Sequence, residues 1–169
     1  VAAGFDSGAT LDYVYRNQAQ GFTGLGRLID RNYLNAIGWQ GIRSRKIHLE
    51  KLLRRAMAEL HAAGEPVRIV DIAAGHGRYV LDAVREQAEI PATGVLRDFS
   101  PANVEAGQRL IADYRLERRF EFERGDAFDP ASLAALPRGA TVGIVSGLYE
   151  LFPDNEPVRA SLAGLAEAV

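Results

Sequence analysis

The residues best suited to ligand chemistry are a glycine-rich turn and two acids further along the chain. The run Asp71-Ile72-Ala73-Ala74-Gly75-His76-Gly77-Arg78-Tyr79 follows a β-branched segment, so a strand would bring this turn to the end of a sheet. Glycines allow a tight turn and let a ligand approach the backbone without a Cβ in the way. The third glycine of a dinucleotide fingerprint is replaced by Val80, and the Gly-Lys-Ser/Thr of a phosphate loop does not follow. The turn therefore suits a ligand that lies along the strand end.

Two acids downstream of the turn could hold the polar groups of a nucleoside. Asp98 closes a second predicted strand 23 residues after Gly75, close to the ~20-residue offset at which an acid meets ribose hydroxyls. Its carboxylate can accept hydrogen bonds from both hydroxyls of an unphosphorylated ribose. Asp126 closes a third strand and could accept from an exocyclic amine, while Phe99 and Phe128 could sandwich an adenine ring. Each acid alone could be an ordinary turn residue and each phenylalanine a packing residue, so their joint placement carries the prediction.

The elements that must position these residues alternate after residue 66. Short apolar or alternating runs predict strands at 67–73, 94–97, 120–123 and 141–145. Helical patterns separate these strands, and Ser100 and Asp129 are placed to cap two of the helices ahead of a proline. A last helix is expected to begin near Pro157 and to be still running at Val169. This alternation predicts right-handed βαβ units and hence a doubly wound parallel sheet of the α/β class.

The first part of the chain reads as three helices without a strand. Asp6 or Ser7 can cap a helix to about Gln20, and a second apolar stretch breaks near Gly38. The third helix has apolar residues at helical spacing from Ile42 to Leu60 and a basic opposite face. We expect residues 1–65 to form a helical cap on a ligand-binding domain at 66–169.

Composition excludes several classes of protein. The chain has 169 residues, of which 47% are hydrophobic and 25% charged, which argues against disorder. It has no cysteine, so disulfides, cysteine-ligated zinc and thiol chemistry are excluded, and its three histidines are too scattered to predict a metal site. A formal charge of −2 argues against a surface built for nucleic acid. We expect a cytoplasmic domain without a membrane span.

Taken together, the ordered motifs resemble the class I S-adenosylmethionine-dependent methyltransferases. Asp71-x-x-x-Gly75-x-Gly77, Asp98 and Gly125-Asp126-Ala127 carry the resemblance, which covers roughly residues 67–155. It implies a Rossmann-like sheet of strand order 3-2-1-4, with S-adenosyl-L-methionine as cofactor. The glycines would let the methionine part lie on the turn, Asp71 would orient the loop and the cofactor's ammonium, Asp98 would hold the ribose, and Asp126 and the Ala127 amide would hold the adenine. The implied cofactor-binding residues are Asp71, Ala73, Gly75, Gly77, Asp98, Phe99, Asp126, Ala127 and Phe128.

The segment after the fourth strand is where methyltransferases of this fold line the transfer site. In Ser146-Gly147-Leu148-Tyr149-Glu150-Leu151-Phe152, Tyr149 and Glu150 are the polar candidates for substrate contact or proton removal. Methyl transfer from a sulfonium mostly needs in-line positioning, so a base is not required, and Tyr149 could equally be a packing residue. Arg43 and Arg45 on the basic helix could bind an anionic substrate or the cofactor carboxylate, or belong to a solvated face.

More narrowly, the tyrosine-rich N-terminal segment and Trp39-Gln40-Gly41-Ile42-Arg43-Ser44-Arg45 resemble a bacterial group of methyltransferases, some of which are fused to an α/β-hydrolase domain. We expect transfer to a small-molecule or lipid-like acceptor. The alternatives are a non-catalytic cofactor-binding module and an RNA methyltransferase, the latter suggested by the basic helix. A sheet of this family has seven strands and this sequence supplies four, so we expect the C-terminal strands to be missing and the fourth strand's open edge to favour a homodimer or association with the missing segment.

Overall fold

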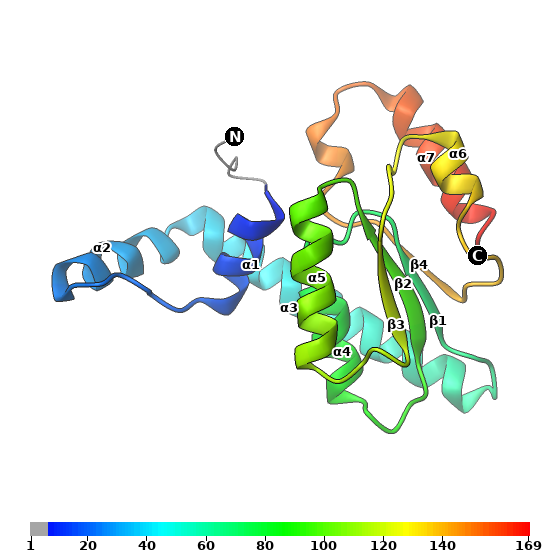
Figure 1. Ribbon diagram of the computed structural model, residues 1–169, viewed down its shortest axis with the longest axis horizontal. Coiled ribbons are helices and arrows are strands. Elements are labelled where there is room, and N and C mark those ends of the chain that lie inside the picture. The colour runs from blue at the N-terminus through cyan, green and yellow to red at the C-terminus, as the bar shows by residue number, and fades with distance from the viewer. Residues whose placement is uncertain (1–6) are drawn as a thin grey trace.

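The computed structural model describes residues 7–169 and shows a sheet with helices on both faces (Figure 1). In chain order, the elements are α1 (Gly8–Arg16), α2 (Gly24–Leu34), α3 (Ile37–Ala62), β1 (Arg68–Asp71), α4 (Arg78–Glu86), β2 (Thr93–Asp98), α5 (Pro101–Asp113), β3 (Phe120–Arg124), α6 (Pro130–Ala134), β4 (Val142–Ile144), the 3₁₀ helix η1 (Tyr149–Leu151) and α7 (Asn155–Ala166). Within this part of the chain, none of the helices has the length and apolar character that crossing a bilayer requires.

The sheet has the predicted topology. Its order is β3-β2-β1-β4 and every neighbouring pair is parallel. Asp71 at the end of β1 lies in register with Leu96 on β2 and with Ile144 on β4. The carboxyl ends of all four strands therefore meet at one edge, and the loops that follow them surround a common crevice.

Each face of the sheet has its own apolar core. Ile69, Leu96 and Phe120 belong to the core on the side of α3, α4 and α5, together with Leu53 and Met57 of α3. On the other side, the sheet packs against α6 and α7 through a second set of apolar residues: Val70, Ile72, Leu133, Leu136 and Leu165. Figure 1 shows this layering, with α4 and α5 on one side of the strands and α6 and α7 on the other. The Rossmann-like prediction is thus confirmed.

The N-terminal helices differ in extent from the prediction. Ser7 caps α1 by accepting from the Thr10 amide, whereas Asp6 lies outside the described residues. The helix ends at Arg16, before Gln20, because Asn17 adopts a left-handed conformation with φ 50°.

The break predicted near Gly38 was wrong. It lies instead at residues 35–36, and Gly38 and Gly41 fall within the first turns of α3. A Cβ at either glycine would have nothing within 4 Å, so the helix continues through them on an open surface.

Two predicted helix ends in the second half also differ. The Ser100 hydroxyl does not cap α5. The start of α5 is held by Asp98, which accepts from the Ser100 amide and from Asn103 Nδ2. Asp129 caps α6 as predicted, accepting from two amides of the first turn. The last helix begins at Asn155 behind the capping carboxylate of Asp154 and ends at Ala166, so the expectation of a helix still running at Val169 was wrong.

Candidate functional site

The glycine turn between β1 and α4 depends on two left-handed residues. Gly75 has φ +62° and Gly77 has φ +71°, a region that residues with a Cβ rarely adopt. The amide of Gly77 donates to the Ala74 carbonyl at 2.8 Å, and a Cβ on Gly77 would lie only 2.6 Å from Leu96 Cδ1. Gly77 is buried and faces the core, so close packing of α4 on β2 accounts for this glycine. Gly75 lies at the surface of the crevice.

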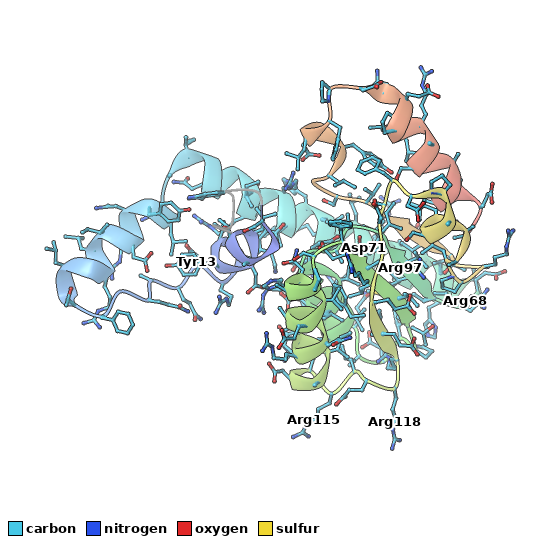
Figure 2. The ribbon with its side chains drawn as sticks, turned by 45° about the horizontal axis from the view of Figure 1, so that its top comes forward. Tyr13, Arg68, Asp71, Arg97, Arg115 and Arg118 are labelled. Atoms are coloured by element: carbon cyan, nitrogen blue, oxygen red, sulfur yellow. The ribbon has the colours of Figure 1, made fainter. Side chains whose placement is uncertain are left out.

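Asp71 lies inside the protein, beneath the turn (Figure 2). Its Oδ1 accepts from the Ala73 amide at 3.1 Å, and its Oδ2 accepts from the Tyr79 hydroxyl. Burial raises the pKa of Asp71 to about 7, against the opposing effect of these two hydrogen bonds. The carboxyl group holds the loop in the predicted way, while its expected contact with a cofactor ammonium stays a prediction.

Asp98 is the acid most directly presented to the crevice. Its Oδ2 accepts from the Gly75 amide at 3.0 Å, and its Oδ1 accepts from the Ser100 amide and from Asn103 Nδ2, both at 2.9 Å. A carboxylate offers about four acceptor positions. One position is therefore open, and Asn103 is the one of the three donors that a side-chain rotation can withdraw.

Two cavities adjoin at Asp98. The first, which we name the turn cavity, has a volume of about 590 Å³, within the range of about 300–1,000 Å³ that is typical of ligand sites. It is bounded by α1, the glycine turn, the start of α5 and the segment after β4. The second, the aromatic cavity, measures about 350 Å³ and is lined by Ile72, Ala73, Asp98, Phe99, Asp126, Ala127, Phe128, Leu148 and Phe152. Ala73, Asp98 and Leu148 line both cavities, so the two form one continuous site around the end of β2.

The aromatic cavity brings together four of the predicted adenine contacts. Phe99 is 61% exposed and has the Arg124 guanidinium 5.4 Å from its ring centroid. Phe128 packs on Phe152 with the ring centroids 4.5 Å apart. Asp126 Oδ1 accepts from the Phe128 amide at 2.9 Å, which shapes the turn after β3. The cavity thus has aromatic surface and a carboxylate side by side, as recognition of an amine-bearing ring requires.

The residues predicted for catalysis do not line either cavity. The Tyr149 hydroxyl donates to Ser161 Oγ at 2.8 Å, and Ser161 in turn donates to the Ala127 carbonyl, which joins η1 to α7 and to the aromatic cavity wall. Glu150 Oε1 accepts from Arg45 Nη1 at 2.6 Å. Both side chains are engaged in holding the segment after β4 in place.

The arginines predicted to bind substrate have structural partners. Arg43 Nη1 donates to the Leu34 carbonyl at 2.7 Å and so joins the end of α2 to α3, away from both cavities. Arg45 pairs with Glu150 and passes close to Gly147, whose Cβ would lie 3.0 Å from Arg45 Nη2. Arg45 thus reaches the rear of the turn cavity, which Gly147 lines, whereas Arg43 does not.

Most of the basic face of α3 is neutralised by acids. Lys46 pairs with Glu50 and Asp82, Arg54 with Glu86, and Arg55 with Glu59. These pairs account for the charge pattern without a nucleic-acid ligand. Among residues 7–169 there is also no group of three or more acidic or histidine side chains placed to hold a metal ion.

Asp12 on α1 is a site residue that the sequence did not reveal. It is 5% exposed, lines the turn cavity, accepts from Arg78 at the start of α4 and lies 3.6 Å from His76 Nδ1. Burial alone would raise its pKa, but the hydrogen bonds and charges of His76 and Arg78 outweigh burial and lower the pKa to about 2. Because Asp12 and Arg78 are 66 residues apart, no local pattern signals their pairing.

The chain is similar to known proteins over its whole length. A family model described as "Putative methyltransferase" matches residues 1–169. "Uncharacterized protein YnbC" of Escherichia coli K12 is 56% identical over 169 residues, which is all of this chain and 29% of that protein. The chain therefore spans less than a third of the length of this relative.

Two solved structures show the same fold at low identity. A "possible exported protein" from Bordetella parapertussis has a TM-score of 0.70 at 17% identity and matches 96% of this chain and 50% of its own. An O-methyltransferase family protein from Burkholderia thailandensis has a TM-score of 0.56 at 20% identity, over 83% of this chain and 41% of its own.

Proposed function

The chain belongs to the methyltransferase family whose model it matches, and on that premise we propose that it binds S-adenosyl-L-methionine across the two cavities and transfers the methyl group to a small-molecule or lipid-like acceptor. The observation that carries this proposal is the position of Asp98. This carboxylate lies where the turn cavity meets the aromatic cavity, between a glycine turn and a pair of phenylalanines.

The cofactor divides chemically into the parts that the two cavities would hold. Its aminocarboxypropyl chain would lie in the turn cavity beside Gly75, and its adenine in the aromatic cavity between Phe99 and Phe128. The ribose would then lie at Asp98. One ribose hydroxyl can use the open acceptor position of the carboxylate, and the second can take the place of the Asn103 amide.

Positioning is the main contribution of this chain to the reaction. Bound S-adenosylmethionine supplies an electrophilic methyl group on a sulfonium. The protein must hold the acceptor atom in line with it, which can supply much of the rate enhancement. Tyr149 forms a hydrogen bond with Ser161, and Glu150 forms an ion pair with Arg45. We therefore assign Tyr149 and Glu150 the role of holding the segment after β4 at the mouth of the site. Arg45 is the remaining candidate for an anionic group of the acceptor.

Calorimetric titration with S-adenosylmethionine and S-adenosylhomocysteine tests the cofactor assignment. Asp98→Ala removes the acceptor of two ribose hydroxyls, each charge-assisted bond contributing about 1.5–3 kcal/mol, so we expect affinity to fall at least tenfold. Asp113→Ala, at an exposed acid at the end of α5, is the matched control and should bind as the wild type does. Absence of binding by the wild type, or unchanged affinity in Asp98→Ala, would sink the assignment.

We also propose that the chain is catalytically active and that it is located in the cytoplasm. A chain that binds the cofactor but transfers no methyl group to any acceptor would be the non-catalytic module considered above. The paired charges on α3 give no support to RNA methylation, and binding of RNA that weakens with salt would be the result that revives it. We retain the cytoplasm as the proposed location.

A further inference from the structure

Helix α2 presents its apolar residues to solvent. Leu25, Leu28 and Ile29 are 68%, 53% and 61% exposed, and their spacing places them on one side of the helix. The residues turned toward the rest of the molecule are the partly buried Asp30 and the buried Leu34, four residues apart on the opposite side. An amphipathic helix of a globular protein ordinarily buries its apolar side, so this orientation is reversed.

The exposed apolar surface extends beyond the helix. Phe22, just before the capping residue Thr23, is fully exposed, and Ile37 at the start of α3 is 87% exposed. An apolar residue in the position of Phe22 commonly packs on the fourth residue of the helix, but here that residue is Arg27. Figure 1 shows α2 projecting away from the sheet, at the far end from α6 and α7. We name the exposed side chains of Phe22, Leu25, Leu28, Ile29 and Ile37 the α2 patch.

The charges around the α2 patch are basic. The charged residues of α2 are Arg27, Asp30 and Arg31, which give the helix a net charge of +1. Asp30 is partly exposed, and its carboxylate accepts from the Gln20 amide at 2.6 Å. Arg27 and Arg31 are exposed on α2 itself. The chain as a whole carries −2, so this positive charge is a local feature.

We propose that the α2 patch docks on the surface of an anionic lipid bilayer. A short helix with one apolar side and cationic residues beside it can lie in the interface, with apolar side chains among the acyl chains and cations at the headgroups. Each arginine near an anionic surface contributes about 1 kcal/mol. A second copy of the chain fits less well, because two-fold pairing of α2 would bring the arginines of both copies together. The proposal does not depend on methyl transfer.

Vesicle flotation with the full chain tests this docking. We expect it to float with vesicles of phosphatidylcholine mixed with phosphatidylglycerol and to stay behind with phosphatidylcholine alone. Leu28→Ser with Ile29→Ser should abolish flotation, while Leu52→Ser, which changes a 64% exposed leucine of α3 outside the patch, should not. Arg27→Ala and Arg31→Ala should each weaken partitioning about fivefold. Arg118→Ala, which changes a side chain at the lower edge of the molecule in Figure 2, away from α2, should leave partitioning unchanged.

Several results would overturn the proposal. These are equal flotation with neutral vesicles, no flotation with either kind, or flotation of the Leu28→Ser, Ile29→Ser variant at the wild-type level. Light scattering without lipid provides a further arm: a dimer that this double variant dissociates would assign the α2 patch to a second copy instead. Circular dichroism of each variant separates loss of docking from loss of the fold, since all the substituted side chains are exposed.

Discussion

Asp71 is the residue whose chemistry depends most strongly on its surroundings. Its carboxyl group is fully enclosed and has two hydrogen-bond donors, Ala73 and Tyr79. Two donors do not replace the hydration that an ionised carboxylate loses on burial, so the pKa of Asp71 is raised to about 7. Near neutral pH, the protonated and ionised forms therefore coexist directly below the glycine turn.

The raised pKa of Asp71 predicts a pH-dependent stability. The pKa of Asp71 in the folded protein is about 7, above the ordinary 3.8. The contribution of Asp71 to the free energy of unfolding is therefore complete below pH 3.8 and is lost as the pH rises through 7. Asp71→Asn lacks this titration. In urea unfolding, the free energy of the variant minus that of the wild type should therefore rise between pH 4 and 7, at up to about 1.4 kcal/mol per pH unit. A difference that stays constant with pH would contradict the raised pKa.

Two glycines allow a matched comparison of substitutions. Gly77→Ala combines a left-handed backbone with a Cβ 2.6 Å from Leu96 Cδ1, so we expect the free energy of unfolding to fall by about 2–4 kcal/mol. Gly41→Ala lies in α3 with open space around the new methyl group and should raise it by about 0.5–1 kcal/mol. Urea unfolding measures both. A Gly77→Ala protein as stable as the wild type would show that α4 does not need this close approach to β2.

Among the elements, α1 completes the site by covering the turn cavity. It is joined to α4 by the pair of Asp12 and Arg78, and Arg78 Nη1 also donates to the Tyr114 hydroxyl at 3.1 Å. Tyr114 donates to Asp82, which pairs with Lys46 of α3. One polar network thus joins α1 to α3, to α4 and to the C-terminal end of α5, where Tyr114 lies. Its members come from distant parts of the chain.

Asp12→Asn should loosen this cover. The variant replaces a buried carboxylate that pairs with the half-buried Arg78 by a neutral amide, at a cost of about 1–3 kcal/mol. Hydrogen exchange of the α1 amides should become faster at neutral pH, and the affinity for S-adenosylmethionine should fall. Asp113→Asn is the control. The pKa of Asp12 is lowered to about 2. The difference in free energy of unfolding between the wild type and Asp12→Asn should therefore shrink as the pH falls from 3.8 through 2. Unchanged α1 exchange would show that Asp12 does not hold the helix.

Some features of the fold and of the site could be predicted from the sequence, and others depend on contacts between residues far apart in the chain. The parallel sheet and the position of Asp98 at a strand end were predictable from the alternation of strands and helices, and the strand order from the resemblance to the methyltransferases. The partners of Arg43 and Arg45 were not, since Glu150 lies 105 residues from Arg45 and the Leu34 carbonyl carries no side-chain signal. The Ser100 hydroxyl does not cap α5, and no local pattern signals that the Asp98 carboxylate accepts from the Ser100 amide.

At the scale of the whole molecule, the candidate cofactor site and the α2 patch lie on different surfaces. The carboxyl edge of the sheet holds the two cavities, and α2 projects from the side of the molecule that carries the N-terminal helices (Figure 1). The helical cap proposed for residues 1–65 thus contributes both to the site, through Asp12, and to the α2 patch. The lining of the aromatic cavity comes from the end of β2, from the loops after the strands and from the residues on either side of η1, and no residue of α2 contributes to it.

The strand order has a consequence for the order in which the protein assembles. β1, β2 and β3 pair with short crossovers between them, but β4 joins β1 only after the whole of β2, β3 and three helices has been made. Closing longer loops costs more chain entropy, so we expect the β1–β4 pair to form later than the other two pairs of the sheet. Leu148 and Phe152 follow β4 and complete the walls of the two cavities. The site therefore exists only once β4 has docked on β1, and a ligand that fills it stabilises the docked state over partly folded ones.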